Sequence, residues 1–294
     1  MAKQTVYEIV TQKILDRLET GTAPWHKPWR GGLQFQPKSF ATRKPYNGMN
    51  VWLLGWSAQD KGYQSPYWIT YKKAKSLDGQ VRKGEKSTLV VFWKTFETEK
   101  TTDSGKKETS THWMLRYYNL FNIEQMDGLD ETKLPADITP EPEETLDFTP
   151  IEHCEQIIRQ MQTPPTIKHS NQRRAFYRPS DDVVHMPNKE TFETEPGYYA
   201  TTFHELAHST GHEKRLARKK FNLASFGSCD YSKEELVAEM TAAMLCGVCD
   251  IENDIIDNSA SYIDNWRKAI KGNVKLVVQA ATHAQKAANY ILNK

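Results

Sequence analysis

Cysteine is scarce in this 294-residue chain, and long apolar runs are absent. Four cysteines in a chain of this length do not provide the disulfide framework of a small secreted domain. No segment approaches the run of about 20 apolar residues that a membrane-spanning helix needs. Charged and apolar residues are mixed from Met1 to Leu18, which predicts an amphipathic helix rather than a signal peptide. We therefore expect a cytoplasmic protein with no membrane partner.

The net charge of +2 conceals an uneven distribution of charge along the chain. Residues 1–126 hold 20 Lys and Arg against 11 Asp and Glu, residues 127–150 hold one Lys against eight acidic residues, and residues 151–294 hold 18 of each sign. We expect two domains, 1–126 and 151–294, joined by the acidic, proline-rich segment 127–150. Its composition buries too little apolar surface to offset the entropy of ordering, which predicts a solvated linker. The alternative is that it folds back onto the basic domain and competes with a polyanion.

The most specific motif is His204-Glu-Leu-Ala-His208. On an α-helix this i, i+4 spacing places the two imidazoles about 40° apart around the axis and about 6 Å apart along it, so both can bind one ion. Glu205 lies beside them, where it can take a proton from a metal-bound water and pass it to a leaving amine. The motif predicts a metallopeptidase site on a helix that begins near Gly197 and stops near Gly211.

A catalytic zinc needs three protein ligands and one open position. The helix expected from Ser232 offers Glu235 as the preferred third ligand, and Glu239 on the same face as the alternative, or as the acceptor for the free N–H of a ligand imidazole. His212 competes less well, because Gly211 breaks the helix and the spacing of zincins that use three histidines is absent. A simpler role for Glu235, in a helix-capping box with Ser232, stays open.

Two short strands around a turn are expected between residues 175 and 187, before the metal-binding helix. Val183–Met186 is the candidate edge strand, which could pair with an extended peptide. Four side chains near the motif could donate to an oxyanion, although each could equally be a packing residue: Tyr177, His185, Tyr198 and Tyr199. Cys246-Gly-Val-Cys249 is a lone C-x-x-C, which favours buried thiols at a helix end over a metal or redox site.

Cations alternate with aromatic residues in the N-terminal region, which contains seven of the eight tryptophans. This pattern is typical of single-stranded nucleic acid binding, because bases stack on the rings while Lys and Arg neutralise the backbone. The alternative is that these rings build the core of a small domain, and we expect most of them to be core residues. The candidate DNA contacts are Trp25, Lys27, Trp29, Arg30, Arg43, Lys44, Tyr46, Lys72, Lys73, Arg82, Lys83 and Lys86.

The overall expectation is an α+β fold. The N-terminal domain is expected to be a small α+β unit with an antiparallel sheet, in which residues 97–110 form a long hairpin tip. The C-terminal domain is expected to be mostly helical with a short β-sheet.

Six short patterns together resemble a known family, and they span nearly the whole chain. They are Ala23-Pro-Trp25-x-x-Pro-Trp29, Tyr46-Asn-Gly48-x-Asn50, Trp68-Ile-Thr70, Val81-x-Lys-Gly-Glu-Lys86, His204-Glu-Leu-Ala-His-Ser-Thr-Gly-His212 and Glu234-Glu-Leu-Val-Ala-Glu239. The sequence is similar to the ArdC antirestriction proteins, whose domains also occur in plasmid-borne primases.

The resemblance implies an N-terminal domain that binds single-stranded DNA, with weaker duplex binding, and a C-terminal zincin-like metallopeptidase domain. It implies Zn²⁺, or another divalent transition metal such as Mn²⁺, and an unidentified protein substrate. In related zincins the pattern E-x-x-A-[DNE] falls on Glu235, Ala238 and Glu239, which favours Glu235 as third ligand with Glu239 behind it. The implied role is protection of plasmid DNA from host restriction, in the bacterial cytoplasm or after transfer into a recipient cell during conjugation.

Two functions stay open on these grounds. In the first the protein is an active peptidase that its DNA-binding domain brings to a substrate. In the second it coats DNA, and the metal site is structural or regulatory. The intact Glu205 favours retained catalysis, because nothing structural requires a glutamate there. A nuclease is disfavoured, because the motif brings no second cluster of carboxylates.

Overall fold

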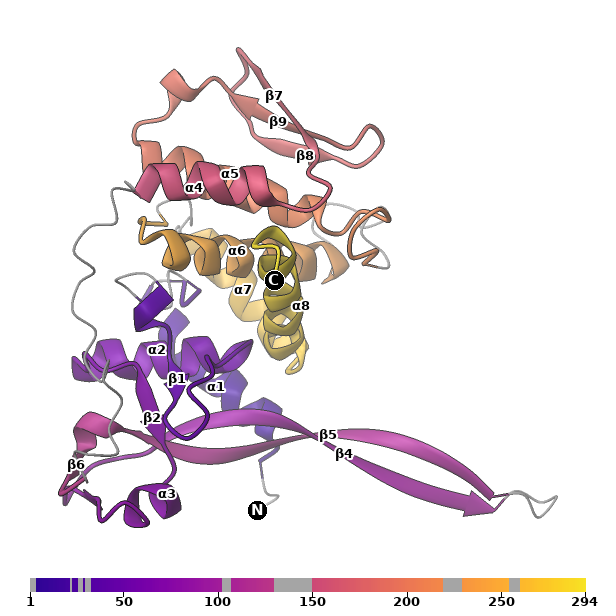
Figure 1. The fold of residues 1–294 in the computed structure, drawn as a ribbon. Helices are drawn as coiled ribbons and strands as arrows, with labels where there is room; N and C mark the ends of the chain where they lie inside the picture. Colours follow the sequence, from indigo (N-terminus) through magenta and orange to yellow (C-terminus); the bar gives the residue numbers. More distant parts are fainter. Residues whose placement is uncertain are drawn as a thin grey trace.

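The computed structural model describes residues 4–21, 23–25, 29, 33–101, 107–129, 150–218, 229–253 and 260–294. The fold is α+β, as predicted. A small three-stranded sheet lies above a stack of helices, and the N-terminal helices and sheet lie below it, with one long β-ribbon extending to the side (Figure 1). None of the described helices is long and apolar enough to cross a membrane.

The described part of the N-terminal half contains three α-helices and six strands. Thr5 caps the first helix, since its side chain accepts from the backbone of Glu8 while the Glu8 carboxylate accepts from the backbone of Thr5. The elements are α1 (Val6–Leu18), η1 (Leu33–Phe35), β1 (Lys38–Ser39), α2 (Met49–Lys61), β2 (Tyr67–Ile69), α3 (Tyr71–Lys75), β3 (Gln80–Val81), β4 (Thr88–Thr101), β5 (Lys107–Asn122), η2 (Ile123–Gln125) and β6 (Met126–Asp127).

The main sheet of this half has the order β1-β2-β5-β4, and its last two strands form the ribbon. β4 and β5 are paired without interruption from Thr88 opposite Leu120 to Thr101 opposite Lys107. The expected hairpin tip at 97–110 was therefore too long, because the ladder continues through its Thr, Lys and Glu residues as far as Thr101 and Lys107.

The C-terminal half, as far as the structure describes it, consists of five α-helices and three strands. They are α4 (Pro150–Gln160), β7 (Thr166–Ser170), β8 (Phe176–Arg178), β9 (Val183–Pro187), η4 (Lys189–Thr191), α5 (Glu195–Ser209), α6 (Cys229–Cys249), α7 (Ala260–Gly272) and α8 (Leu276–Ile291). The sheet order is β7-β9-β8, so the expectation that Val183–Met186 is an edge strand was wrong. The polar strand β7, which the sequence did not predict, pairs in parallel with β9 and places it in the centre.

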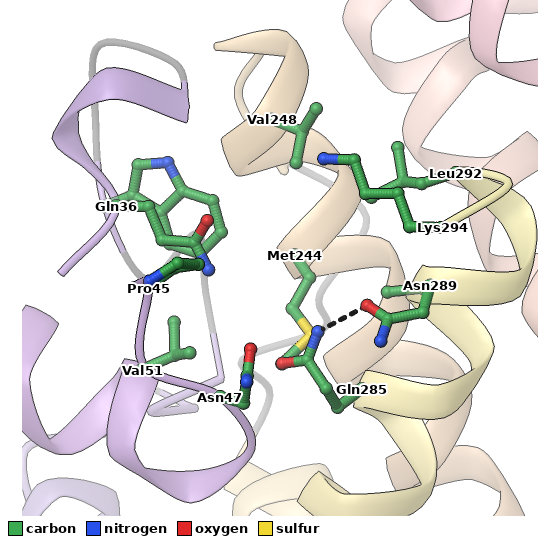
Figure 2. Close-up of a pocket in the computed structure, with 12 residues that line it drawn as sticks. Gln36, Pro45, Asn47, Val51, Met244, Val248, Gln285, Asn289, Leu292 and Lys294 are labelled. Atoms are coloured by element: carbon green, nitrogen blue, oxygen red, sulfur yellow. Dashed lines mark hydrogen bonds between the residues drawn. The ribbon is translucent and has the colours of Figure 1, made fainter. Parts of the chain in front are cut away.

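One apolar core joins the two halves. The ring of Trp25 packs edge-on against Trp266, with centroids 5.0 Å apart. The backbone N–H of Gly48 donates to Gln285 Oε1 in α8 (3.0 Å). A cavity of about 80 Å³ remains between α2 and the helices α6 and α8, with Gln285 and Asn289 hydrogen-bonded on its wall (Figure 2).

The division into domains stays a prediction. The two expected domains share the core just described. Most of the expected linker, residues 130–149, lies outside the described residues. Both the solvated linker and its alternative, folding back onto the basic domain, therefore stay predictions.

Candidate metal centre

Helix α5 carries both histidines of the motif on one face. Its first turn is capped by the side chain of Thr194, which accepts from the backbone N–H of Gly197 (3.1 Å). Leu206 is fully buried and holds the opposite face of the helix in the core. The i, i+4 spacing then places His204 Nε2 3.1 Å from His208 Nε2.

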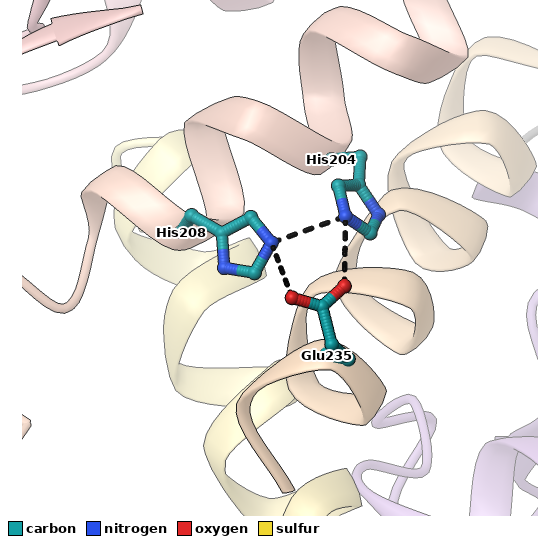
Figure 3. Close-up of side chains that lie close together, drawn as sticks. All are labelled: His204, His208 and Glu235. Atoms are coloured by element: carbon teal, nitrogen blue, oxygen red, sulfur yellow. Dashed lines mark hydrogen bonds and ion pairs between the residues drawn. The ribbon is translucent and has the colours of Figure 1, made fainter. Parts of the chain in front are cut away.

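Helix α6 brings a carboxylate to the same point. Glu235 Oε2 lies 3.6 Å from His204 Nε2, and Glu235 Oε1 lies 3.5 Å from His208 Nε2 (Figure 3). Ligands at about 2.0–2.1 Å from a tetrahedral ion lie about 3.3 Å from one another. The three side chains have this spacing, and they form the one cluster of metal-binding type among the described residues. They are the same three residues that the sequence singled out, and they fit a divalent metal.

The motif predicts that Glu205 is the general base. Glu205 follows His204 on α5 and is buried, with 7% of its surface exposed. Its carboxylate is near enough to His204 to raise the pKa of that imidazole. A buried carboxylate beside a metal-bound water is placed to receive a proton from it.

His204 is the most strongly perturbed histidine of the site. Burial lowers its pKa, but the contact with the Glu235 carboxylate and the charges of Glu205, Glu235 and Glu239 together raise it to about 9. A proton held this firmly marks a position where positive charge is stabilised, and a divalent cation would benefit from the same carboxylates. Nδ1 of His204 is buried and has no hydrogen-bond partner among the described residues, so Glu239 does not orient this ring through a hydrogen bond.

Sequence reasoning missed Glu234, which faces the other histidine. Glu234 Oε1 lies 3.8 Å from His208 Nδ1, on the side of the ring away from Glu235. Arg218 forms an ion pair with Glu234 and also donates to the backbone carbonyl of Ala207 (3.0 Å). Burial raises the pKa of Glu234, but His208 and Arg218 outweigh it and lower that pKa below its ordinary value. The only sequence signal was a second glutamate directly before Glu235.

The alternative third ligand, His212, is not part of the cluster. Helix α5 ends at Ser209, and His212 Nδ1 accepts a hydrogen bond from the backbone N–H of Lys214 (3.2 Å). The end of the helix thus directs His212 away from Glu235, as the glycine at position 211 suggests.

The three candidate tyrosines use their hydroxyls in contacts within the fold. Tyr177 donates to Asp182 (2.9 Å), Tyr199 donates to Glu155 (2.8 Å), and Tyr198 bonds with His169 Nε2 (2.9 Å). His185 stacks on Phe176, with ring centroids 4.7 Å apart. These contacts favour the packing interpretation of all four residues. Cys246 and Cys249 are buried at the end of α6, in agreement with the expectation of helix-end thiols.

The candidate DNA contacts separate into buried rings and exposed cations. Trp25 and Trp29 have 1% and 6% of their surface exposed, so they are core residues and cannot serve as stacking platforms in this structure. Lys27 and Arg30 lie outside the described residues. Tyr46 is half-buried, and Arg43 lies over the ring of Phe40, 4.5 Å from its centroid. The remaining candidates are exposed: Lys44, Lys72, Lys73, Arg82, Lys83 and Lys86.

Two family models match the chain. Residues 4–121 match the N-terminal domain of anti-restriction factor ArdC, and residues 152–283 match a zincin-like metallopeptidase. The chain is 37% identical to the crystallised antirestriction ArdC protein of the R388 plasmid in its metal-free form, covering 97% of this chain and 96% of that one with a TM-score of 0.74. The Mn(II)-bound form of that protein matches with 36% identity, 99% and 98% coverage and a TM-score of 0.74.

Curated relatives are also similar over nearly the whole chain. The chain is 36% identical to a DNA primase TraC of Escherichia coli, over 99% of this chain and 27% of that protein. It thus spans about a quarter of the length of that relative, and of a second TraC it spans 20%. An uncharacterised protein of Sinorhizobium fredii, y4eC, is 33% identical over 97% of this chain and 91% of its own length.

Proposed function

This chain belongs to the ArdC family of antirestriction proteins, and from that premise we propose that it protects incoming DNA from restriction by binding single-stranded DNA and by cleaving a protein at its metal centre. The observation that carries the peptidase part is the convergence of His204, His208 and Glu235 beside the buried Glu205. We propose residues 1–126 for DNA binding and residues 151–294 for peptide hydrolysis.

His204, His208 and Glu235 would hold the ion, which we propose to be Zn²⁺ or Mn²⁺. The related ArdC protein of the R388 plasmid has a Mn(II)-bound structure. The ion supplies a Lewis acid that polarises the scissile carbonyl and makes a bound water acidic. Three protein ligands leave a position open for that water, as a catalytic site requires.

Glu205 performs the proton transfers in this mechanism. Its carboxylate takes the proton of the attacking water and then gives it to the nitrogen of the leaving amine. Because Glu205 is buried on the rigid helix α5, it keeps its position relative to His204 through both steps. Glu205 is not one of the three clustered residues, so its replacement should leave the proposed ligand set intact.

Single-stranded DNA is proposed as the nucleic acid partner. Residues 1–126 carry a net charge of +9, and several of their cations are exposed, among them Lys72, Lys73 and Lys83. Each phosphate that such a cation neutralises releases counterions, so affinity should fall steeply as salt rises. A binding isotherm for an oligothymidylate that is insensitive to salt concentration would contradict this mechanism.

The peptidase part is tested with Glu205→Gln in the full-length protein. We expect unchanged metal content and DNA affinity, together with loss of protection of incoming DNA in a conjugation assay. Glu213→Gln is the matched control, since Glu213 is an exposed residue just past the end of α5. If Glu205→Gln protects DNA as well as the wild type, the protein acts by coating DNA and the metal site is structural or regulatory.

A further inference from the structure

The ribbon of β4 and β5 concentrates exposed aromatic surface. Seven of the nine large apolar side chains that are exposed among the described residues lie on it: Phe92, Trp93, Phe96, Trp113, Met114, Tyr117 and Tyr118. The ribbon leaves the body of the molecule and extends to one side (Figure 1). Exposed aromatic side chains that gather on one element mark an interaction surface.

Strand alternation divides the ribbon into two faces. Side chains of residues paired across an antiparallel ladder point to the same side, and successive residues point to opposite sides. The register therefore groups one set of side chains, here named the cationic face: Phe92, Lys94, Phe96, His112, Met114, Arg116 and Tyr118. The opposite face holds Trp93, Trp113 and Tyr117.

The opposite face anchors the ribbon to the body. Val91 and Leu115 on that face are buried in the main core, and Tyr7 of α1 packs edge-on against Trp93 with ring centroids 6.3 Å apart. At the edge of β4, the side chain of Asn50 bonds with the backbone of Val91. Val90 and Leu120, which share the side of the cationic face, are buried at the same base, so the exposed part of that face lies beyond them.

Aromatic pairs and cations alternate along the cationic face. The rings of Phe92 and Tyr118 lie 5.5 Å apart between centroids, and Phe96 stacks on His112 at 5.5 Å. Phe92 and Phe96 are four residues apart on one strand, or about 13 Å at about 3.3 Å per residue. Lys94 and Met114 lie opposite each other between the two pairs, and Arg116 lies opposite Phe92.

The charge of this face suits a polyanion. Its described side chains from residues 90–98 and 110–118 include no carboxylate, because Glu97 pairs with Thr111 on the opposite face. Lys94 and Arg116 form no ion pair within the described part of the chain, so both are available to phosphates. The distal part of the same face is polar, with Thr98 hydrogen-bonded to Ser110, which disfavours insertion of the ribbon into a membrane.

We propose that the cationic face of the β4–β5 ribbon is the surface on which single-stranded DNA stacks. Bases stack on the pairs that contain Phe92 and Phe96, and Lys94 and Arg116 neutralise the phosphates between them. Tyr118 lies beside Tyr46, so the surface continues onto the body beside the exposed Arg43 and Lys44. This inference rests on the proposed binding of single-stranded DNA. It places the binding surface on the ribbon, away from the buried Trp25 and Trp29 that the sequence suggested.

The test measures binding of a fluorescent oligothymidylate by the full-length protein over a range of salt concentrations. Loss of one base–aromatic stack weakens binding about 5- to 150-fold, so Phe92→Ala with Phe96→Ala should weaken it at least tenfold. Lys94→Gln with Arg116→Gln should reduce the slope of log affinity against log salt by about 1.4, or about 0.7 for each phosphate that is no longer neutralised.

Trp113→Ala is the matched control on the same ribbon. Trp113 is the most exposed of these aromatic side chains, at 66%, and it lies on the opposite face. We expect the affinity of Trp113→Ala for the oligothymidylate to stay within twofold of the wild-type value. All variants should keep the melting temperature and the sedimentation coefficient of the wild type.

The outcomes separate the inference from the proposed function. Failure of the wild type to bind the oligothymidylate would overturn both. Binding by the wild type that Phe92→Ala with Phe96→Ala leaves unchanged would overturn the inference alone. An equal loss in Trp113→Ala, or a change of oligomeric state in the variants, would show that the ribbon acts through nonspecific apolar contact or self-association, and would also overturn it.

Discussion

Glu234 Oε1 lies 3.8 Å from His208 Nδ1, on the side of the imidazole that faces away from the metal-binding nitrogen. A carboxylate in this place fixes the orientation and tautomer of a ligand histidine and increases its basicity. Arg218 holds Glu234 through an ion pair that is largely buried, with side chains 8% and 18% exposed.

Glu234→Gln should therefore lower metal affinity about 10- to 100-fold, the range found when such supporting partners are replaced. Competition with a chromophoric chelator measures the dissociation constant. Glu193→Gln, at an exposed position before α5, is the matched control and should leave it unchanged. Equal affinities for Glu234→Gln and the wild type would show that His208 needs no support from this carboxylate.

Asn50 takes the place of a missing strand at the free edge of β4. Its side-chain amide donates to the carbonyl of Val91 (2.8 Å) and accepts from the N–H of Val91 (2.7 Å). Asn50→Ala leaves both backbone groups of a buried residue without these bonds, which should cost about 2–4 kcal/mol of unfolding free energy. Urea unfolding measures the loss, and Asn47→Ala at an exposed position should change stability by less than about 0.5 kcal/mol. An equally small effect of Asn50→Ala would mean that the edge is solvated.

Local patterns predicted the parts of the structure that depend on helical and strand periodicity. The spacing of His204 and His208 already places two rings on one face, whatever the rest of the fold does. Glu235 required only that a second helix approach α5 with its glutamates inward. Arg218 could not be predicted in the same way, because its position depends on the path of the chain after α5.

Tertiary packing explains why Trp25 and Trp29 are buried, although the sequence made them candidate DNA contacts. Trp25 and Trp29 lie in a Pro- and Gly-rich segment that is typical of an exposed loop, but helices distant in sequence cover it. Trp266 covers Trp25, and Gly247 of α6 leaves room for Trp29, since a Cβ at Gly247 would lie 3.1 Å from the Trp29 ring. Most of the exposed rings among the described residues are instead on β4 and β5, where alternation predicts strands but does not show which face is covered.

Trp29→Ala tests the core assignment directly. Removing a buried Trp side chain costs about 3–5 kcal/mol through reduced burial and the cavity that remains. We expect a loss of this size in urea unfolding, while the folded fraction binds oligothymidylate like the wild type. Trp113→Ala removes the same side chain from an exposed position and should change stability by less than about 0.5 kcal/mol. A stable Trp29→Ala protein with weakened DNA binding would restore Trp29 as a DNA contact.

The ion pair between Asp182 and Arg215 fixes the end of helix α5 and makes stability depend on pH. Arg215 has a fully buried side chain, and its Nε donates to the carbonyl of Ser209, the last residue of α5 (2.6 Å). Burial raises the pKa of Asp182, but Arg215 and the hydroxyl of Tyr177 outweigh it and lower that pKa below its ordinary value. The pair therefore contributes its full stability above about pH 4, and the contribution is lost as pH falls through the lowered pKa.

Asp182→Asn keeps a residue that tolerates the positive φ of 57° at this position but removes the charge that compensates Arg215. We expect it to lower the unfolding free energy by about 3 kcal/mol at pH 7, because it leaves a buried guanidinium without its carboxylate. The difference from the wild type should shrink below about pH 4, where the wild-type carboxyl is protonated first in the unfolded chain and, at lower pH, in the folded protein as well. Asp181→Asn is the matched control, since Asp181 pairs with Arg178 at the surface. Urea unfolding at pH 7, 5 and 3 measures both variants, and a difference for Asp182→Asn that stays constant over this range would show that its charge does not stabilise the fold.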